Sequence, residues 1–168
     1  MEKILFNEFE IRNNVKQLGE MISTDYKLSD TIVVIGILKG AFMFTSDLVK
    51  NISVPSLIDF VEVKSYKGTE SNGKPELTKD LTISVQGKDV ILVDGIIDTG
   101  YTLDFLIKYL RSKGANTVKT AVLLDKKCKR KVPVKVNYCC FEIEDKFVVG
   151  YGMDYLQLYR NIPYIKEL

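Results

Sequence analysis

The sequence predicts an α/β fold, a single domain with a mostly parallel central sheet flanked by helices. Short apolar, β-branched runs alternate along the chain with segments whose apolar residues recur every three or four positions. The runs are apolar on both faces, which is typical of buried strands in parallel sheets. A length of 168 residues suits one domain. We expect it to span residues 1–168, because no linker or internal repeat interrupts the pattern.

Three segments have helical spacing. In the first, apolar residues recur at spacings of four, three and four: Ile11, Val15, Leu18 and Ile22. The second helix is expected within residues 39–52. The third should begin near Thr102 and end before Gly114, which would occupy the left-handed C′ position.

Seven runs are predicted as strands or as the close of the strand pattern: residues 31–38, 57–63, 81–85, 89–93, 117–124, 136–143 and 146–152. The third and fourth runs are separated only by Gln86-Gly87-Lys88, which predicts a hairpin or a tight turn between two strands. Residues 64–76, KSYKGTESNGKPE, are polar and without a period, and they predict a long mobile loop.

Composition excludes several classes of protein. The net charge is only +2, so no overall field favours nucleic acid or an anionic membrane as a partner. The chain has no histidine, which removes Ser-His and Cys-His hydrolases and His-ligated zinc sites. The three cysteines, Cys128, Cys139 and Cys140, favour small apolar filler in a reducing compartment over a disulfide framework.

The N-terminal residues lack a charged leader followed by an apolar run, and no apolar stretch approaches the ~20 residues of a membrane span. We therefore expect no signal peptide, no membrane partner and a cytoplasmic location.

Ligands of open parallel sheets bind beyond the carboxyl ends of the strands. The loops of interest therefore follow Leu38, Val63, Val93, Leu124 and Ile143.

The loop in VILVDGIIDTGYTL, residues 90–103, has the richest chemistry. Thr99, Gly100 and Thr102 offer hydroxyls and backbone N–H groups at a helix N-terminus, which are the parts of a phosphate cradle. Asp94 and Asp98 would repel a bare phosphate but suit sugar hydroxyls, Mg²⁺ or a proton. Alternatively, Asp98 and Thr99 serve only to cap the helix. The chain has neither a P-loop nor a GxGxxG motif, which disfavours a dinucleotide-binding oxidoreductase.

Three further loops have both a functional and a structural interpretation. Lys39 and Gly40 present a charge and a bare N–H to a pyrophosphate, or they form a solvent-exposed turn. The basic residues 126–131 favour a solvated loop over a nucleic-acid patch, since no aromatics interleave them, although Lys126 at the strand end can face a ligand. Residues 146–160 supply an aromatic ring, a backbone edge, Asp154 and Arg160 for a flat heterocycle, or simply core packing and an ion pair.

From ILKGAFMF to YRNIPYI, the chain resembles the hypoxanthine-guanine phosphoribosyltransferases, purine-salvage enzymes with the type I phosphoribosyltransferase fold. VILVDGIIDTGYTL resembles the signature that binds 5-phosphoribosyl pyrophosphate, and KSY, LLDK, FEIEDKFVVGYGMDY and YRN resemble further family motifs in the same order. The resemblance implies a small hood, a mobile lid loop, and Mg²⁺-dependent transfer of 5-phosphoribosyl to hypoxanthine or guanine, giving IMP or GMP and pyrophosphate. It leaves xanthine open.

The resemblance also implies a role for each matched residue. Asp98 is the acid/base group at purine N7, and Lys126 donates to the exocyclic O6, which selects 6-oxopurines over adenine. Phe147 stacks on the ring, while the Val148 backbone and Asp154 read its far edge.

The remaining matched residues bind the sugar, the phosphates and the metal. Those implied for the ribose and the 5′-phosphate are Asp94, Gly95, Asp98, Thr99, Gly100, Tyr101 and Thr102. Those implied for pyrophosphate are Lys39, Gly40 and Arg160, with a peptide before Lys39 that can be cis. Those implied for the lid are Ser65 and Tyr66, and those for Mg²⁺ are Asp94 and Asp154.

One departure affects the metal and the ribose. The family signature has Glu then Asp after its strand, whereas this chain has Asp94 and Gly95. Gly95 alone favours a regulatory protein that binds the ligand without turning it over, and retention of Asp98 and Lys126 argues against that. By resemblance we expect a homodimer or homotetramer, with apolar surface around residues 42–44 at an interface.

Overall fold

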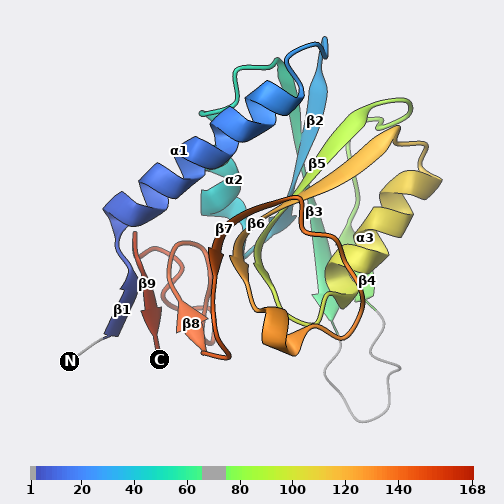
Figure 1. Ribbon diagram of the computed structural model, residues 1–168. Helices are drawn as coiled ribbons and strands as arrows, with labels where there is room; N and C mark the ends of the chain where they lie inside the picture. Colours follow the sequence, from blue (N-terminus) through green and yellow to red (C-terminus); the bar gives the residue numbers. More distant parts are fainter. Residues whose placement is uncertain (1–2, 66–74) are drawn as a thin grey trace.

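A six-stranded sheet forms the centre of the molecule, with strand order β4-β3-β2-β5-β6-β7 (Figure 1). The computed structural model describes residues 3–65 and 75–168, without the side chain of Ser65. The strands are β2 (Ile32–Leu38), β3 (Ser56–Ser65), β4 (Pro75–Lys79), β5 (Asp89–Ile97), β6 (Thr117–Asp125) and β7 (Tyr138–Glu142). Only β4, at one edge, runs antiparallel to its neighbour. The predicted mostly parallel α/β sheet is confirmed.

Helices cover both faces of the sheet, also as predicted. Helix α1 (Glu8–Asp25) and helix α2 (Phe42–Val49) pack on one face, against Val34, Ile91 and Val93. Helix α3 (Tyr101–Ser112) packs on the other face, against the alternate residues Val33, Val90 and Leu92. Each central strand contributes side chains to both layers, and its sequence is therefore a continuous run of apolar residues.

The helix ends follow local chemistry. Asn7 and Glu10 form a reciprocal capping box at the start of α1, with side chain to backbone distances of 2.8 and 3.0 Å. Helix α3 ends at Ser112, and Gly114 takes the predicted left-handed C′ conformation, with φ of 85°.

A small second sheet forms the hood, which lies beside the carboxyl ends of the central strands (Figure 1). It pairs β1 (Lys3–Phe6) with β9 (Ile165–Glu167), and β9 with β8 (Val148–Val149). The first and last strands of the chain are thus neighbours, and a Lys3–Glu167 ion pair of 3.3 Å joins them. The predicted run 146–152 contributes only two residues of strand.

The strand predicted over residues 81–85, and with it the hairpin to 89–93, is wrong. These residues form an irregular segment because the buried carboxylate of Asp59, on β3, takes their backbone donors. The N–H groups of Thr82 and Ile83 donate to it at 2.6 and 3.1 Å. Backbone donors satisfied by a side chain are not available to a neighbouring strand.

The loop predicted over residues 64–76 is too long at both ends. Lys64 and Ser65 end β3, and Pro75 and Glu76 begin β4, paired antiparallel. Pro75 lies at the first residue of an edge strand, where its missing N–H costs no ladder hydrogen bond. The rest of that predicted lid, Tyr66 included, lies outside the described residues.

The apolar surface expected around residues 42–44 is only partly present. Phe42 is 41% exposed, but Phe44 is fully buried against the sheet and belongs to the core. Within residues 3–65 and 75–168, no helix is both long and apolar enough to cross a membrane.

Candidate active site

A cavity of about 510 Å³ opens where the loops after β2, β5 and β6 meet the hood. Eight of the residues singled out in the sequence line it: Lys39, Gly40, Asp98, Lys126, Phe147, Val148, Asp154 and Arg160. Ile96, Lys129, Asp145 and Met153 complete its lining. Residues far apart in the sequence therefore converge at the carboxyl edge of the sheet, as parallel topology requires.

The loop after β5 brings an acid and a helix N-terminus to this edge. Asp98 is exposed and lines the cavity. Gly100 is the N-cap of α3, with φ of 91° and no side-chain cap bond, so neither Asp98 nor Thr99 serves as the N-cap. The cavity lining does not include Thr99, Gly100, Tyr101 or Thr102, which lie beside it at the start of α3. Backbone N–H groups at such a start favour an anion.

Asp94 lies deeper, within β5. Burial raises the pKa of its carboxyl to about 7, and the N–H groups of Gly95 and Ile96 offset only part of that rise. Asp94 is partly exposed, and neither it nor Gly95 lines the cavity, although Ile96, two residues further along β5, does. A carboxyl whose pKa is raised this far by burial is typical of a functional group.

The loop after β2 is held by close backbone contacts. The Leu38–Lys39 peptide is cis, as the family resemblance suggested. The Gly40 carbonyl lies between two glycines, because a Cβ added at Gly95 or Gly152 would meet it at 2.8 or 2.5 Å. A Cβ at Gly40 itself would meet nothing within 4 Å, so this residue has open space on its side-chain face. A ligand can therefore approach the Gly40 main chain closely.

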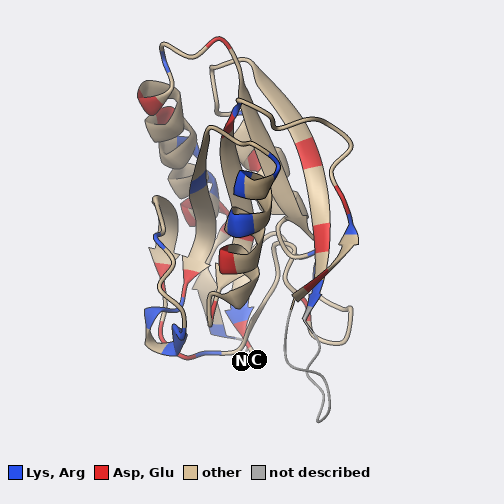
Figure 2. Cartoon of the chain, turned by 90° about the vertical axis from the view of Figure 1, so that its right-hand side faces the viewer, with Lys and Arg blue, Asp and Glu red and all other residues tan. Residues whose placement is uncertain are grey.

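The loop after β6 is largely the solvated basic loop that its composition favoured, since Lys127, Lys129 and Lys131 are exposed, but it begins with a buried lysine that lines the cavity. Lys126 is only 7% exposed, and its N–H donates to the Ile97 carbonyl at 3.0 Å. Arg130 is ion-paired with the buried Asp125, and only Lys127 and Lys129 form exposed pairs, with Glu142 and Asp145. Figure 2 shows basic and acidic residues close together at the carboxyl end of the sheet.

The hood supplies an aromatic face and an ion pair. Phe147 is 54% exposed and meets Tyr155 edge-on, with ring centroids 5.7 Å apart. Arg160 pairs with Asp154 at 2.9 Å and donates to the Gly152 carbonyl at 2.7 Å. Its Nε is buried and has no hydrogen-bond partner within the described residues.

Sequence reasoning missed three features of this site. Lys129 and Asp145, joined at 2.6 Å, line the cavity, and Arg130 supports its loops. A basic run such as 126–131 does not reveal which cation is buried. The expected lid residue Tyr66 lies outside the described residues, and of Ser65 only the backbone, at the end of β3, is described.

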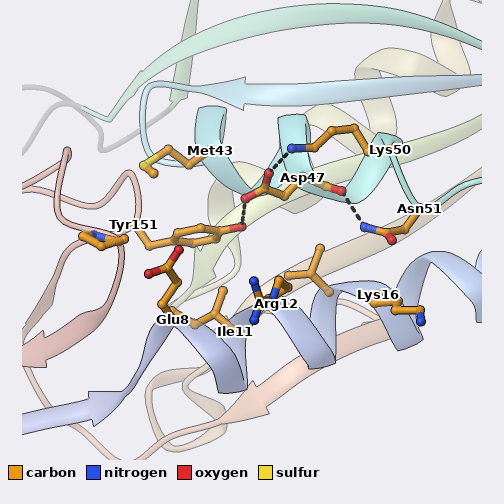
Figure 3. Close-up of a pocket in the computed structure, with 11 residues that line it drawn as sticks. Glu8, Ile11, Arg12, Lys16, Met43, Asp47, Lys50, Asn51 and Tyr151 are labelled. Atoms are coloured by element: carbon orange, nitrogen blue, oxygen red, sulfur yellow. Dashed lines mark hydrogen bonds and ion pairs between the residues drawn. The ribbon is translucent and has the colours of Figure 1, made fainter.

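A second cavity, of about 440 Å³, lies between α1 and α2 (Figure 3). The side chains of Arg12, Lys16, Lys50, Glu8 and Asp47 lie around it, so its charges nearly balance. None of the residues predicted for the site lines it, and the first cavity remains the candidate.

Within the described residues no group of three or more acidic or cysteine side chains is close enough to hold a metal ion. Mg²⁺ does not need such a cluster, because it commonly binds one or two carboxylates together with substrate phosphates and water. Asp154 lines the cavity, where it pairs with Arg160, and Asp94 lies within β5 outside the lining, so each could supply a carboxylate oxygen to an ion that is held mainly by substrate phosphates.

Comparison with known proteins gives a consistent result. A model of the phosphoribosyl transferase domain matches residues 7–156. The hypoxanthine-guanine phosphoribosyltransferases of Staphylococcus epidermidis and Bacillus subtilis are each 44% identical, over all of this chain and 94% and 93% of their own lengths.

Solved structures agree. The hypoxanthine-guanine phosphoribosyltransferase of Bacillus anthracis, with a HEPES molecule in its active site, is 40% identical, with a TM-score of 0.94, and the match covers 100% of this chain and 99% of that one. The hypoxanthine phosphoribosyl transferase of Trypanosoma cruzi is 37% identical, with a TM-score of 0.94, over 99% of this chain and 91% of that one.

Proposed function

The chain belongs to the phosphoribosyl transferase family, and on that premise we propose that it is a purine-salvage enzyme. It transfers 5-phosphoribosyl from 5-phosphoribosyl pyrophosphate to hypoxanthine or guanine and releases pyrophosphate with IMP or GMP. Relatives that span the whole chain at 44% identity are hypoxanthine-guanine phosphoribosyltransferases, which supports this substrate class.

The observation that carries the proposal is the convergence of two sets of groups on one cavity. Lys39, Gly40 and Arg160 suit pyrophosphate, and Lys126 and Phe147 suit a 6-oxopurine. Since both sets line the same space, a phosphorylated sugar between them would meet a purine on one side and its leaving group on the other.

On the purine side, the Asp98 carboxylate holds or takes the proton at N7. The Lys126 ammonium donates to O6, while Phe147 stacks on the ring. A buried ammonium donor rejects adenine, whose amino group at this position leaves the donor without an acceptor. Val148 and Asp154 face the opposite edge of the base.

On the sugar side, the start of α3 holds the 5′-phosphate with Thr99, Gly100, Tyr101 and Thr102, while Asp94 contacts the ribose hydroxyls. Lys39, Gly40 and Arg160 bind the departing pyrophosphate, and the two cations offset its negative charge. Bound Mg²⁺, held by Asp94 and Asp154 with substrate phosphates, would supply further positive charge at the leaving group.

We also propose a homodimer or homotetramer working in the cytoplasm. The Trypanosoma cruzi relative, whose C-terminal region has a role in its oligomeric state and activity, supports the first point. Three free cysteines suit a reducing compartment.

Purified protein, 5-phosphoribosyl pyrophosphate and a Mg²⁺ series tested with hypoxanthine, guanine, xanthine and adenine would decide the matter, with nucleotide formation followed by absorbance. Turnover of hypoxanthine and guanine but not of adenine is the expected result. Tight binding of 5-phosphoribosyl pyrophosphate without nucleotide formation at any Mg²⁺ concentration would instead favour a regulatory protein.

A further inference from the structure

Arg130 lies between the loop after β5 and the end of β6. Its guanidinium bonds to three groups: Nε donates to the Asp98 carbonyl at 3.2 Å, one terminal nitrogen donates to the Val134 carbonyl at 3.3 Å, and the other pairs with Asp125. Asp98 is the proposed acid/base group, and Asp125 immediately precedes Lys126. One side chain therefore spans the two loops that contact the purine.

The stem of Arg130 packs where Gly100 has no side chain. A Cβ at Gly100 would meet the Cδ of Arg130 at 3.0 Å and Val132 at 3.1–3.2 Å. The backbone continues the same contact, because the N–H groups of Lys131 and Val132 both donate to the Thr99 carbonyl, at 2.9 and 3.2 Å. The residues after Arg130 thus hold the main chain just before the start of α3.

The ion pair is sheltered from water. The Asp125 side chain is 3% exposed and the Arg130 side chain 18%. Only a planar guanidinium can reach the carboxylate and two carbonyls in different directions at once, so a lysine keeps the charge but loses most of the geometry.

We propose that Arg130 is a positioning residue for the transfer reaction, fixing the main chain at Asp98 relative to Lys126 without touching the substrate. The role assigned to it rests on the proposed function. A group placed by a single rigid side chain loses its alignment when that side chain is shortened, and outer-shell partners of this kind are worth about 10- to 100-fold in activity.

Two variants test this. Arg130→Lys retains the charge opposite Asp125. The double variant Asp125→Asn/Arg130→Gln removes both charges, so it leaves no unpaired buried carboxylate that would threaten folding. For both we expect kcat to fall about 10- to 100-fold and the KM for 5-phosphoribosyl pyrophosphate to rise, with the KM for hypoxanthine changed less than about threefold. The hypoxanthine KM should hold because Phe147 and the hood remain in place.

Lys131→Gln is the control, because Lys131 is an exposed neighbour on the same loop and contacts Thr99 only through its backbone N–H, which the substitution keeps. It should keep native kinetics. Melting temperatures are measured for every variant, and assays are run well below the lowest of them. Native kcat in both Arg130 variants, or an equal loss in Lys131→Gln, would overturn the proposal. If the native enzyme itself forms no nucleotide, the proposed function has failed instead. The role of Arg130 is then tested by calorimetric binding of 5-phosphoribosyl pyrophosphate, which must weaken in both Arg130 variants and not in Lys131→Gln.

Discussion

Asp98 is the side chain on which the proposed chemistry depends most. It is exposed at the cavity, and Arg130 holds its carbonyl. Asp98→Asn should lower kcat for hypoxanthine about 10²- to 10³-fold, because an amide cannot exchange the N7 proton. Steady-state kinetics would measure the loss. Asp104→Asn, in the first turn of α3 and paired with Lys108, should stay within about twofold. Native kcat in Asp98→Asn would remove Asp98 from the mechanism.

We expect Asp94 to make the proposed use of magnesium depend on pH. Burial raises its pKa to about 7, so the carboxyl is mostly protonated below that pH and mostly ionised above it. Metal binding needs the ionised form, so the Mg²⁺ concentration for half-maximal rate should rise by up to about tenfold per unit as pH falls below 7, and level off above it. Titrations of Mg²⁺ at pH 6, 7 and 8 would measure this. Asp94→Asn should flatten the dependence, and a native enzyme with no such dependence would contradict the role of Asp94.

For single residues, the sequence shows which side chains are candidates for the site better than it shows their burial and their partners. Lys39, Asp98, Lys126 and Phe147 were located as loop residues at strand ends, and the structure gathers them around one cavity. Arg130 was not distinguished from the lysines around it. Its burial depends on Asp125 and on the empty space at Gly100, which are tertiary facts.

Among the elements, the connection between β3 and the irregular segment 81–85 depends on Asp59. Its carboxylate accepts from the backbone of Phe60, Thr82 and Ile83 and from the Thr82 hydroxyl. Asp59→Asn should destabilise the protein by about 2–4 kcal/mol, because the amide leaves buried donors unsatisfied. Urea unfolding would measure the loss, with the exposed Asp30→Asn as control.

The pKa of the Asp59 carboxyl also determines how the free energy of unfolding depends on pH. Burial alone would raise its pKa, but the backbone and hydroxyl donors outweigh burial and lower it. A lowered folded-state pKa contributes stability above the unfolded value, about 3.9, that is lost as pH falls through the folded value. The difference in the free energy of unfolding between the native protein and Asp59→Asn should therefore become smaller only below about pH 4. A constant difference down to pH 2 would contradict this account.

A hydrogen bond joins helix α2 to the residues after β8 in the hood. The Tyr151 hydroxyl donates to the Asp47 carboxylate at 2.6 Å, and Lys50 pairs with that carboxylate (Figure 3). Tyr151→Phe should cost about 1 kcal/mol of stability and raise the KM for pyrophosphate in the reverse reaction a few-fold, since α2 follows the Lys39 loop. Tyr159→Phe, which is not part of this hydrogen bond, is the control. An unchanged melting temperature would show that the bond contributes nothing.

Long elements were predicted well, and short ones were not. The central strands and three helices have strong periodicity, whereas β1, β4 and β9 have three to five residues each. Strand β1 pairs with β9 at the opposite end of the sequence, and no local pattern encodes that partner. The wrong strand at 81–85 had an apolar pattern, but Asp59 took its donors.

For the whole molecule, the two core layers share one sheet, and we propose that residues 1–168 unfold as one unit. Each central strand contributes to both layers, so neither layer can be lost alone. Calorimetry should give one transition with equal calorimetric and van't Hoff enthalpies, of roughly 120 kcal/mol near 60 °C for a monomer. Two separate transitions would show that the hood or one layer melts independently.

Gly95 and Gly152, which lie against the Gly40 carbonyl, also limit which substitutions the chain can accept in evolution. The present path of the Lys39 loop leaves no room for an acid at position 95. The Cβ of any side chain there would lie too close to the Gly40 carbonyl. A lone Gly95→Asp change would disturb the loop before its carboxylate could serve ribose or metal. The effect of a substitution at position 95 therefore depends on which residues already shape the Lys39 loop.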